Sequence, residues 1–104
     1  MVIAQGDIWL LETPNEKRRP VLVVTRDEAV AVLNNVVVAP LTTSIRRIPT
    51  CIPVGQEEGI DRESVATFDN LAAVPTSLLT RRLGALGVAG RERICAALRS
   101  VADC

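Results

Sequence analysis

The sequence contains no histidine and no tyrosine, and its only aromatic residues are one tryptophan and one phenylalanine. Histidine is the side chain that ordinarily gains and loses a proton near neutral pH, so proton transfer by this chain has to use other groups. A serine–histidine–aspartate triad and a cysteine–histidine pair are both excluded. Any catalysis therefore has to depend on charge and positioning.

Cysteine is also scarce, because the 104 residues hold three, at positions 51, 95 and 104. Their odd number and wide spacing, with no Cys-x-x-Cys motif, argue against a disulfide framework and against a zinc site. No metal site and no cofactor are predicted. We expect Cys51 and Cys95 to be small buried apolar residues and Cys104 to have no role at the terminus.

No apolar run is long enough to cross a membrane, and the N-terminus lacks the basic start, apolar stretch and cleavage site of a signal peptide. We therefore expect a cytoplasmic protein without a membrane partner. A length of 104 residues suits one domain, residues 1–104. Because hydrophobic residues make up 48% of the chain, it can bury a core without disulfides or metals.

The charges balance at 12 basic and 12 acidic residues, yet every basic residue except Lys17 is arginine. Arginine fits phosphate or carboxylate with two parallel hydrogen bonds, although a GC-rich genome also enriches arginine. The cations cluster at 17–19, 46–47, 81–82 and 91–93, and acids cluster at 57–63. A neutral total can therefore coexist with a basic face.

Short apolar, β-branched segments separated by turn residues predict a mainly β fold. Asp27 is expected to cap the first short helix, and Pro40 to end its strand or lie at a sheet edge. An apolar stripe of Ile94, Ala97, Leu98 and Val101 marks the clearest helix. The expected strands are 6–11, 20–25, 36–41, 50–54 (an edge strand), 64–68 and 82–86, and the expected helices 27–33, 74–79 and 89–102. This pattern suits a strongly bent antiparallel sheet or barrel with attached helices.

Several motifs, in this order and spacing, resemble the MazF/PemK toxins of bacterial toxin–antitoxin modules. They are Gly6-Asp7-Ile8-Trp9, Arg19-Pro20-Val21-Leu22-Val23-Val24, Val38-Ala39-Pro40-Leu41-Thr42-Thr43, the Ser64-Val65 strand ending at Asp69-Asn70, and Arg82-Leu83-Gly84 before a helix. The resemblance implies an α+β, SH3-like barrel with a C-terminal α-helix, assembled as a homodimer. It also implies sequence-specific, metal-independent cleavage of single-stranded RNA to 2′,3′-cyclic phosphate and 5′-hydroxyl ends. A cognate antitoxin with an acidic C-terminal tail is the implied protein partner.

The same resemblance implies roles for three residues. Arg19, directly before Pro20, corresponds to the catalytic arginine of the family, and Thr42 to its catalytic threonine. Some members have an acidic residue at the position of Asp69, proposed as the base, with an arginine two residues earlier. Here Thr67 stands in place of that arginine. Asp69 therefore remains a candidate for a base, a base-reading residue or a structural turn cap.

A further set of residues is expected to contact RNA, namely Lys17, Arg18, Thr43, Ser44, Arg46, Arg47, Phe68 and Asn70. Each has a simpler alternative. The loop cations can be solvated, and the hydroxyls of 42–44 can bond to their own backbone. Trp9 is expected in the core, whereas Phe68 can either pack in the core or stack on a base.

One alternative activity is kept open, a CcdB-like toxin of the same fold that poisons DNA gyrase without cutting RNA. Such proteins end in a short segment that contains a tryptophan. This chain ends Ser100-Val101-Ala102-Asp103-Cys104 and has its only tryptophan at position 9. The sequence therefore favours the nuclease.

Overall fold

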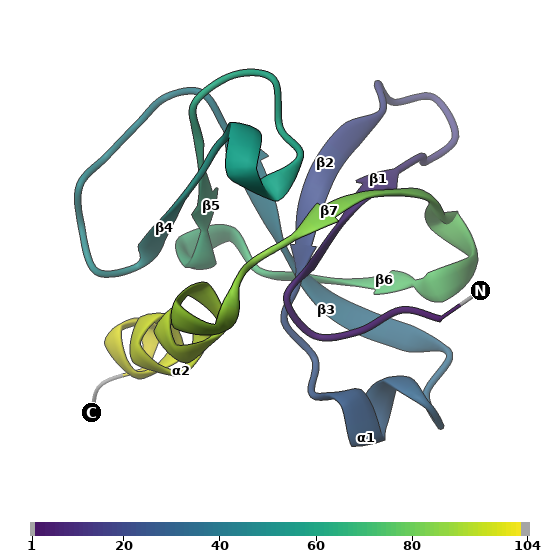
Figure 1. Ribbon diagram of the computed structural model, residues 1–104. Helices are drawn as coiled ribbons and strands as arrows, with labels where there is room; N and C mark the ends of the chain where they lie inside the picture. The colour runs from purple at the N-terminus through teal and green to yellow at the C-terminus, as the bar shows by residue number, and fades with distance from the viewer. Residues whose placement is uncertain (1, 103–104) are drawn as a thin grey trace.

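The structure is a computed structural model that describes residues 2–102. Seven strands, two α-helices and three short 3₁₀ helices follow one another along the chain (Figure 1). In order they are β1 (Asp7–Leu11), β2 (Arg19–Val23), α1 (Asp27–Val30), β3 (Asn35–Thr42), β4 (Cys51–Val54), η1 (Gln56–Glu58), β5 (Ser64–Thr67), η2 (Phe68–Asn70), β6 (Ala72–Pro75), η3 (Thr76–Leu78), β7 (Leu79–Ala85) and α2 (Val88–Val101).

All strand pairs are antiparallel, in the order β4-β5-β3-β2-β1-β7. The long strand β3 also pairs with β6 along its first half and reaches β5 only at its end. The predicted mainly β fold, with a strongly bent antiparallel sheet and a C-terminal helix, is confirmed. The edge position expected for 50–54 is confirmed as well, because β4 is the outermost strand of this order.

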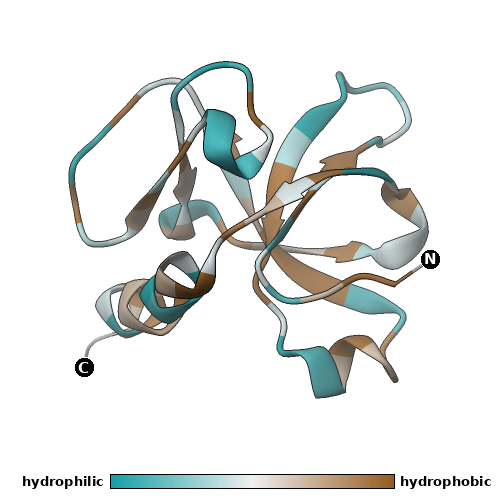
Figure 2. Cartoon of the chain, in the orientation of Figure 1, coloured by the Kyte–Doolittle hydropathy of each residue, from teal (hydrophilic) through white to brown (hydrophobic). Residues whose placement is uncertain are grey.

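Two apolar clusters form the core, one on each face of the bent sheet. Ile8 and Leu22 lie in the first, whereas Trp9, Val21 and Val23 lie in the second. Successive residues of a strand point to opposite faces, so a strand buried on both faces needs an unbroken apolar run. Figure 2 shows this hydrophobic colour along β2 and β3, with hydrophilic residues on the loop between β1 and β2. The predicted core position of Trp9 is confirmed.

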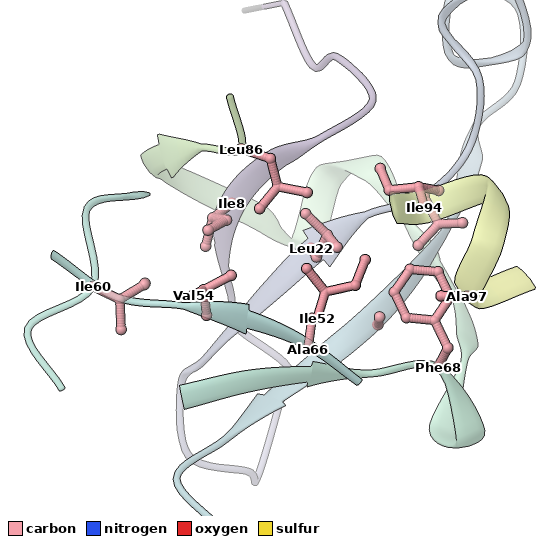
Figure 3. Packing of buried hydrophobic residues seen from close by; sticks show 12 residues of the cluster. Ile8, Leu22, Ile52, Val54, Ile60, Ala66, Phe68, Leu86, Ile94 and Ala97 are labelled. Atoms are coloured by element: carbon pink, nitrogen blue, oxygen red, sulfur yellow. The ribbon is translucent and has the colours of Figure 1, made fainter. Parts of the chain in front are cut away.

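Helix α2 closes the first cluster with Ile94 and Ala97, which are both buried (Figure 3). It packs against β4 and η2. The predicted apolar stripe is therefore confirmed at its centre, while Val101 at its end is 41% exposed. No helix within residues 2–102 is both long enough and apolar enough to span a bilayer.

Two predictions about local structure are wrong. The first helix spans only 27–30, and the Asp27 carboxylate does not cap it but accepts a hydrogen bond from the Gln5 backbone N–H. Residues 72–75 form strand β6 where a helix was expected from 74, and only 76–78 are helical. Tertiary pairing decides this segment, because β6 lies along the first half of β3.

The expectation for Pro40 is also wrong, because this proline lies inside the central strand β3. Val38 is the last β3 residue paired with β6, and Leu41 is the first paired with β5. Pro40 lies between them, after the last residue paired with β6 and before the first residue paired with β5. Its missing N–H therefore interrupts neither the β6 nor the β5 ladder, while on the other side Pro40 is paired with Val21 of β2.

The predicted burial of the cysteines fails for Cys95, which is exposed on α2, and holds only in part for Cys51, which is half-buried. Cys95 follows Ile94, so it lies off the apolar stripe of the helix. Cys104 lies outside the described residues.

Candidate active site

The start of β2 and the end of β3 bring two predicted catalytic residues together. Val21 pairs with Pro40, and continuing this antiparallel register by two residues places Arg19 opposite Thr42. Side chains directly opposite in such a pair have Cβ atoms roughly 5 Å apart. Arg19 is exposed and Thr42 half-buried. Pro20 fixes its own φ and favours an extended backbone at Arg19, so the guanidinium is presented from a well-defined strand.

A cleft of about 680 Å³ opens over this end of the two strands. Most of the predicted site residues line it: Lys17, Arg18, Arg19, Thr42, Ser44, Arg46, Asp69 and Asn70. Thr43 and Arg47 are exposed but do not line it, and Arg47 borders a neighbouring groove instead. The structure thus gathers segments 17–19, 42–46 and 69–70 around one concavity.

Among residues 2–102, four cations and a single carboxylate line this cleft. Arg18 is partly engaged, because its guanidinium lies 3.4 Å from the Glu12 carboxylate in an exposed ion pair. Within residues 2–102, no carboxylate lies at ion-pair distance from Arg19. Arg19 is therefore available to an anion that enters the cleft, and the surrounding excess of positive charge favours such an anion.

Thr42 is held by a local turn. The Ser44 backbone N–H donates to Thr42 Oγ1 over 3.1 Å. This is the local bond between hydroxyl and backbone that the sequence predicts as an alternative for residues 42–44. This bond uses Oγ1 as an acceptor and fixes its position. Among the hydrogen bonds of residues 2–102, the hydroxyl of Thr42 donates to no group. It can therefore donate its hydrogen to a ligand oxygen in the cleft.

Asp69 lies on η2, directly after β5, and its partner comes from the segment before β4. Thr50 Oγ1 donates to Asp69 Oδ2 over 2.7 Å. Among the hydrogen bonds of residues 2–102, the Asp69 carboxylate accepts none from the backbone of its own turn, so the interpretation of Asp69 as a turn cap is wrong. The carboxylate instead connects two segments at the rim of the cleft.

The assignment of Phe68 as an RNA-contacting residue is also wrong. Its side chain is 1% exposed and packs in the first core cluster, beside Ile94 and Ala97 of α2 (Figure 3). Phe68 directly follows β5, where the chain turns, and this turn directs the ring inward. No aromatic face is therefore offered to a base from this position.

Some cleft residues were missed from the sequence. Ile48, Cys51 and Thr67 line it, and buried Thr50 supports it through Asp69. Cys51 and Thr67 are paired across β4 and β5, which a correct strand pairing would have indicated. The sequence around Thr50 did not indicate its role, because its partner Asp69 lies 19 residues further along the chain.

A family model described as "PemK-like, MazF-like toxin of type II toxin-antitoxin system" matches residues 4–102. The chain belongs to the PemK/MazF family of toxins. Arg19-Pro20 and Thr42 lie within the residues that match this family.

Individual relatives of the PemK/MazF family are similar over most of their length. "Probable endoribonuclease MazF5" of Mycobacterium tuberculosis is 35% identical over 102 residues, which cover 97% of this chain and 94% of the relative. "Endoribonuclease MazF3" of the same species is 35% identical over 88 residues, 85% of each chain. The solved structure of "Mycobacterium tuberculosis toxin MazF-mt6" superposes with a TM-score of 0.84 at 33% identity, covering 93% of this chain and 96% of that one.

Proposed function

We propose that this toxin is a sequence-specific endoribonuclease that cuts single-stranded RNA by attack of a ribose 2′-hydroxyl on the adjacent phosphate. The observation that carries the proposal is the placement of Arg19 opposite Thr42 in a cleft with four cations. The names of the relatives at 35% identity support it, since one is named an endoribonuclease and the other a probable endoribonuclease. They also favour it over the gyrase-poisoning alternative.

The reaction makes three demands on the site. The 2′-hydroxyl must lose a proton, the phosphorane oxygens need positive charge, and the 5′-oxygen needs a hydrogen bond or proton as it leaves. Arg19 meets the second demand, because its guanidinium is a cation with five N–H donors. These donors stabilise negative charge on oxygen through hydrogen bonds. We therefore assign Arg19 to the pentacovalent phosphorane and the leaving oxygen.

Thr42 supplies a neutral donor to the same phosphate. Its oxygen is fixed by the Ser44 backbone N–H, so its hydrogen is free to point toward a phosphate oxygen. Lys17, Arg18 and Arg46 bind neighbouring phosphates along the strand. Their contribution makes RNA affinity fall as salt concentration rises, since each phosphate contact releases counterions.

Thr42→Val is expected to lower kcat about 10-fold, the effect of losing one neutral hydrogen bond of roughly 1.4 kcal/mol in the transition state. Thr42→Ser keeps the hydroxyl and should retain most of the activity. Thr43→Val is the matched control, because Thr43 is exposed and does not line the cleft. Single-turnover cleavage of a short RNA measures all three. An equal loss in Thr42→Val and Thr43→Val would contradict the role of Thr42.

The direct test of the proposed activity uses purified protein and single-stranded RNA in EDTA. We expect cleavage to persist, because Arg19 provides the positive charge that a divalent metal would otherwise supply. The products should carry 2′,3′-cyclic phosphate and 5′-hydroxyl ends. A 2′-deoxy nucleotide at the cut site should abolish cleavage, since it removes the nucleophile. Restoration of activity only by a divalent metal, or cutting of the 2′-deoxy substrate, would refute this mechanism.

The proposal extends to partners and location. The family is one of toxin–antitoxin systems, and a cleft with four cations suits the acidic C-terminal tail of a cognate antitoxin. Such a tail would compete with RNA for the same cations. We also propose that the toxin is a homodimer and acts in the cytoplasm, where its RNA substrates are found.

A further inference from the structure

The cleft has two chemically different walls. Three of its four cations are consecutive, Lys17 to Arg19, and none comes from η2. The fourth, Arg46, comes from the segment between β3 and β4. The other side of the cleft is formed by the neighbouring β4, β5 and η2, which contribute Cys51, Thr67, Asp69 and Asn70 and no cation. A single strand of RNA likewise carries phosphates on one side and bases on the other. This division suits a nucleotide whose phosphate meets the cations and whose base meets η2.

The carboxylate on the η2 wall is held in a defined orientation. Thr50 is 9% exposed and is fixed twice: its carbonyl accepts from the Phe68 N–H over 2.8 Å, and its hydroxyl donates to Asp69 Oδ2 over 2.7 Å. Phe68 is itself anchored in the core. The Asp69 carboxylate thus lines the cleft on a rigid support, with Oδ1 free of the Thr50 bond.

A fixed carboxylate accepts hydrogen bonds and donates none. It complements base edges that present amino groups, such as N4 of cytosine, N6 of adenine or N2 of guanine. Uracil instead presents two carbonyl oxygens around a single N–H, and these oxygens would face the carboxylate unfavourably. Sequence-specific RNA recognition reads such edges on unstacked single-stranded bases.

We propose that Asp69 determines sequence specificity by accepting a hydrogen bond from the amino group of a base near the cut, and that Thr50 is its positioning residue. This inference rests on the proposed endoribonuclease function. It assigns Asp69 to recognition rather than to removal of the 2′-hydroxyl proton. Thr67 agrees with this assignment, because position 67 holds no arginine that could form the acid–base pair described above for some family members.

The test compares sequence preference across a single-stranded RNA library with one randomised segment, cut by the wild type and by four variants. Asp69→Asn replaces one acceptor by a donor at an exposed position. We expect it to lose preference for an amino-bearing base at one position of the recognised sequence and to accept uracil there. The rate on the wild-type sequence should fall about 10- to 100-fold, the usual discrimination of such a contact.

Thr50→Val should relax preference at that same position, and Thr50→Ser, which keeps the hydroxyl, should restore it. Asp61→Asn is the matched control, since Asp61 is exposed and does not line the cleft. The sequence preference of this variant should equal that of the wild type. Thermal melting checks that each variant is folded.

The outcomes separate the two proposals. A uniform loss of rate over all sequences in Asp69→Asn, with unchanged preference, would overturn the inference and indicate a role in chemistry. An unchanged rate and preference would overturn it too. If the wild type cuts no member of the library, the proposed function fails and the inference fails with it.

Discussion

Arg19→Ala should lower kcat for RNA cleavage about 10²- to 10³-fold, the usual effect of removing one preorganised transition-state donor. Arg19 is exposed, and within residues 2–102 it has no ion-pair partner, so its loss should leave the fold intact. In the proposed mechanism, the phosphorane would lose the guanidinium that stabilises its negative charge. Single-turnover assays at saturating protein separate this effect from weaker RNA binding.

Two further substitutions sharpen this prediction. Arg19→Lys keeps the charge but loses the planar pair of donors, so its rate should fall between those of the wild type and Arg19→Ala. Arg99→Ala removes an exposed arginine on α2 that does not line the cleft, and should cut at the wild-type rate. Cleavage by Arg19→Ala at the wild-type rate would show that another group stabilises the phosphorane.

The parts of the fold that sequence predicted well are those with strong local signals. Strands β2 and β3 carry apolar runs rich in valine, and α2 carries an apolar stripe of helical spacing. Strand β6 was missed because Ala72–Pro75 has little intrinsic β preference and is extended through its pairing with β3. Pro40 was misplaced because its tolerance in a central strand depends on where two other strands begin and end.

The same distinction between local and long-range signals applies to the candidate site. Arg19 and Thr42 each adjoin the end of a recognisable strand, so a correct pairing of β2 and β3 suffices to bring them together. The bond between Thr50 and Asp69 joins residues 19 apart and depends on how β4 and η2 approach one another. No local pattern specifies that approach. Similarly, whether Phe68 points to the core or to the cleft is decided by the turn after β5.

The inward orientation of Phe68 leads to the largest stability effect expected here. Phe68→Ala should lower the free energy of unfolding by about 3–5 kcal/mol, as typical for truncating a buried phenylalanine. The ring is 1% exposed and contacts the buried face of α2, so its removal leaves a cavity between helix and sheet. In a domain of this size, such a loss lowers Tm by roughly 4–8 °C for each kcal/mol. Denaturant unfolding followed by circular dichroism measures it.

Phe68→Leu distinguishes a core role from base stacking. If the ring packs only in the core, leucine fills much of its volume, so stability should fall by less than in Phe68→Ala and cleavage should be retained. If the ring instead stacked on RNA, leucine would weaken RNA binding while leaving stability nearly unchanged.

The Phe68 N–H also supports Thr50, the partner of Asp69. The cavity left by Phe68→Ala should therefore increase the mobility of the Asp69 carboxylate. We expect the sequence preference of Phe68→Ala to fall more than that of Phe68→Leu, because the packing of the core holds the residue that reads the base.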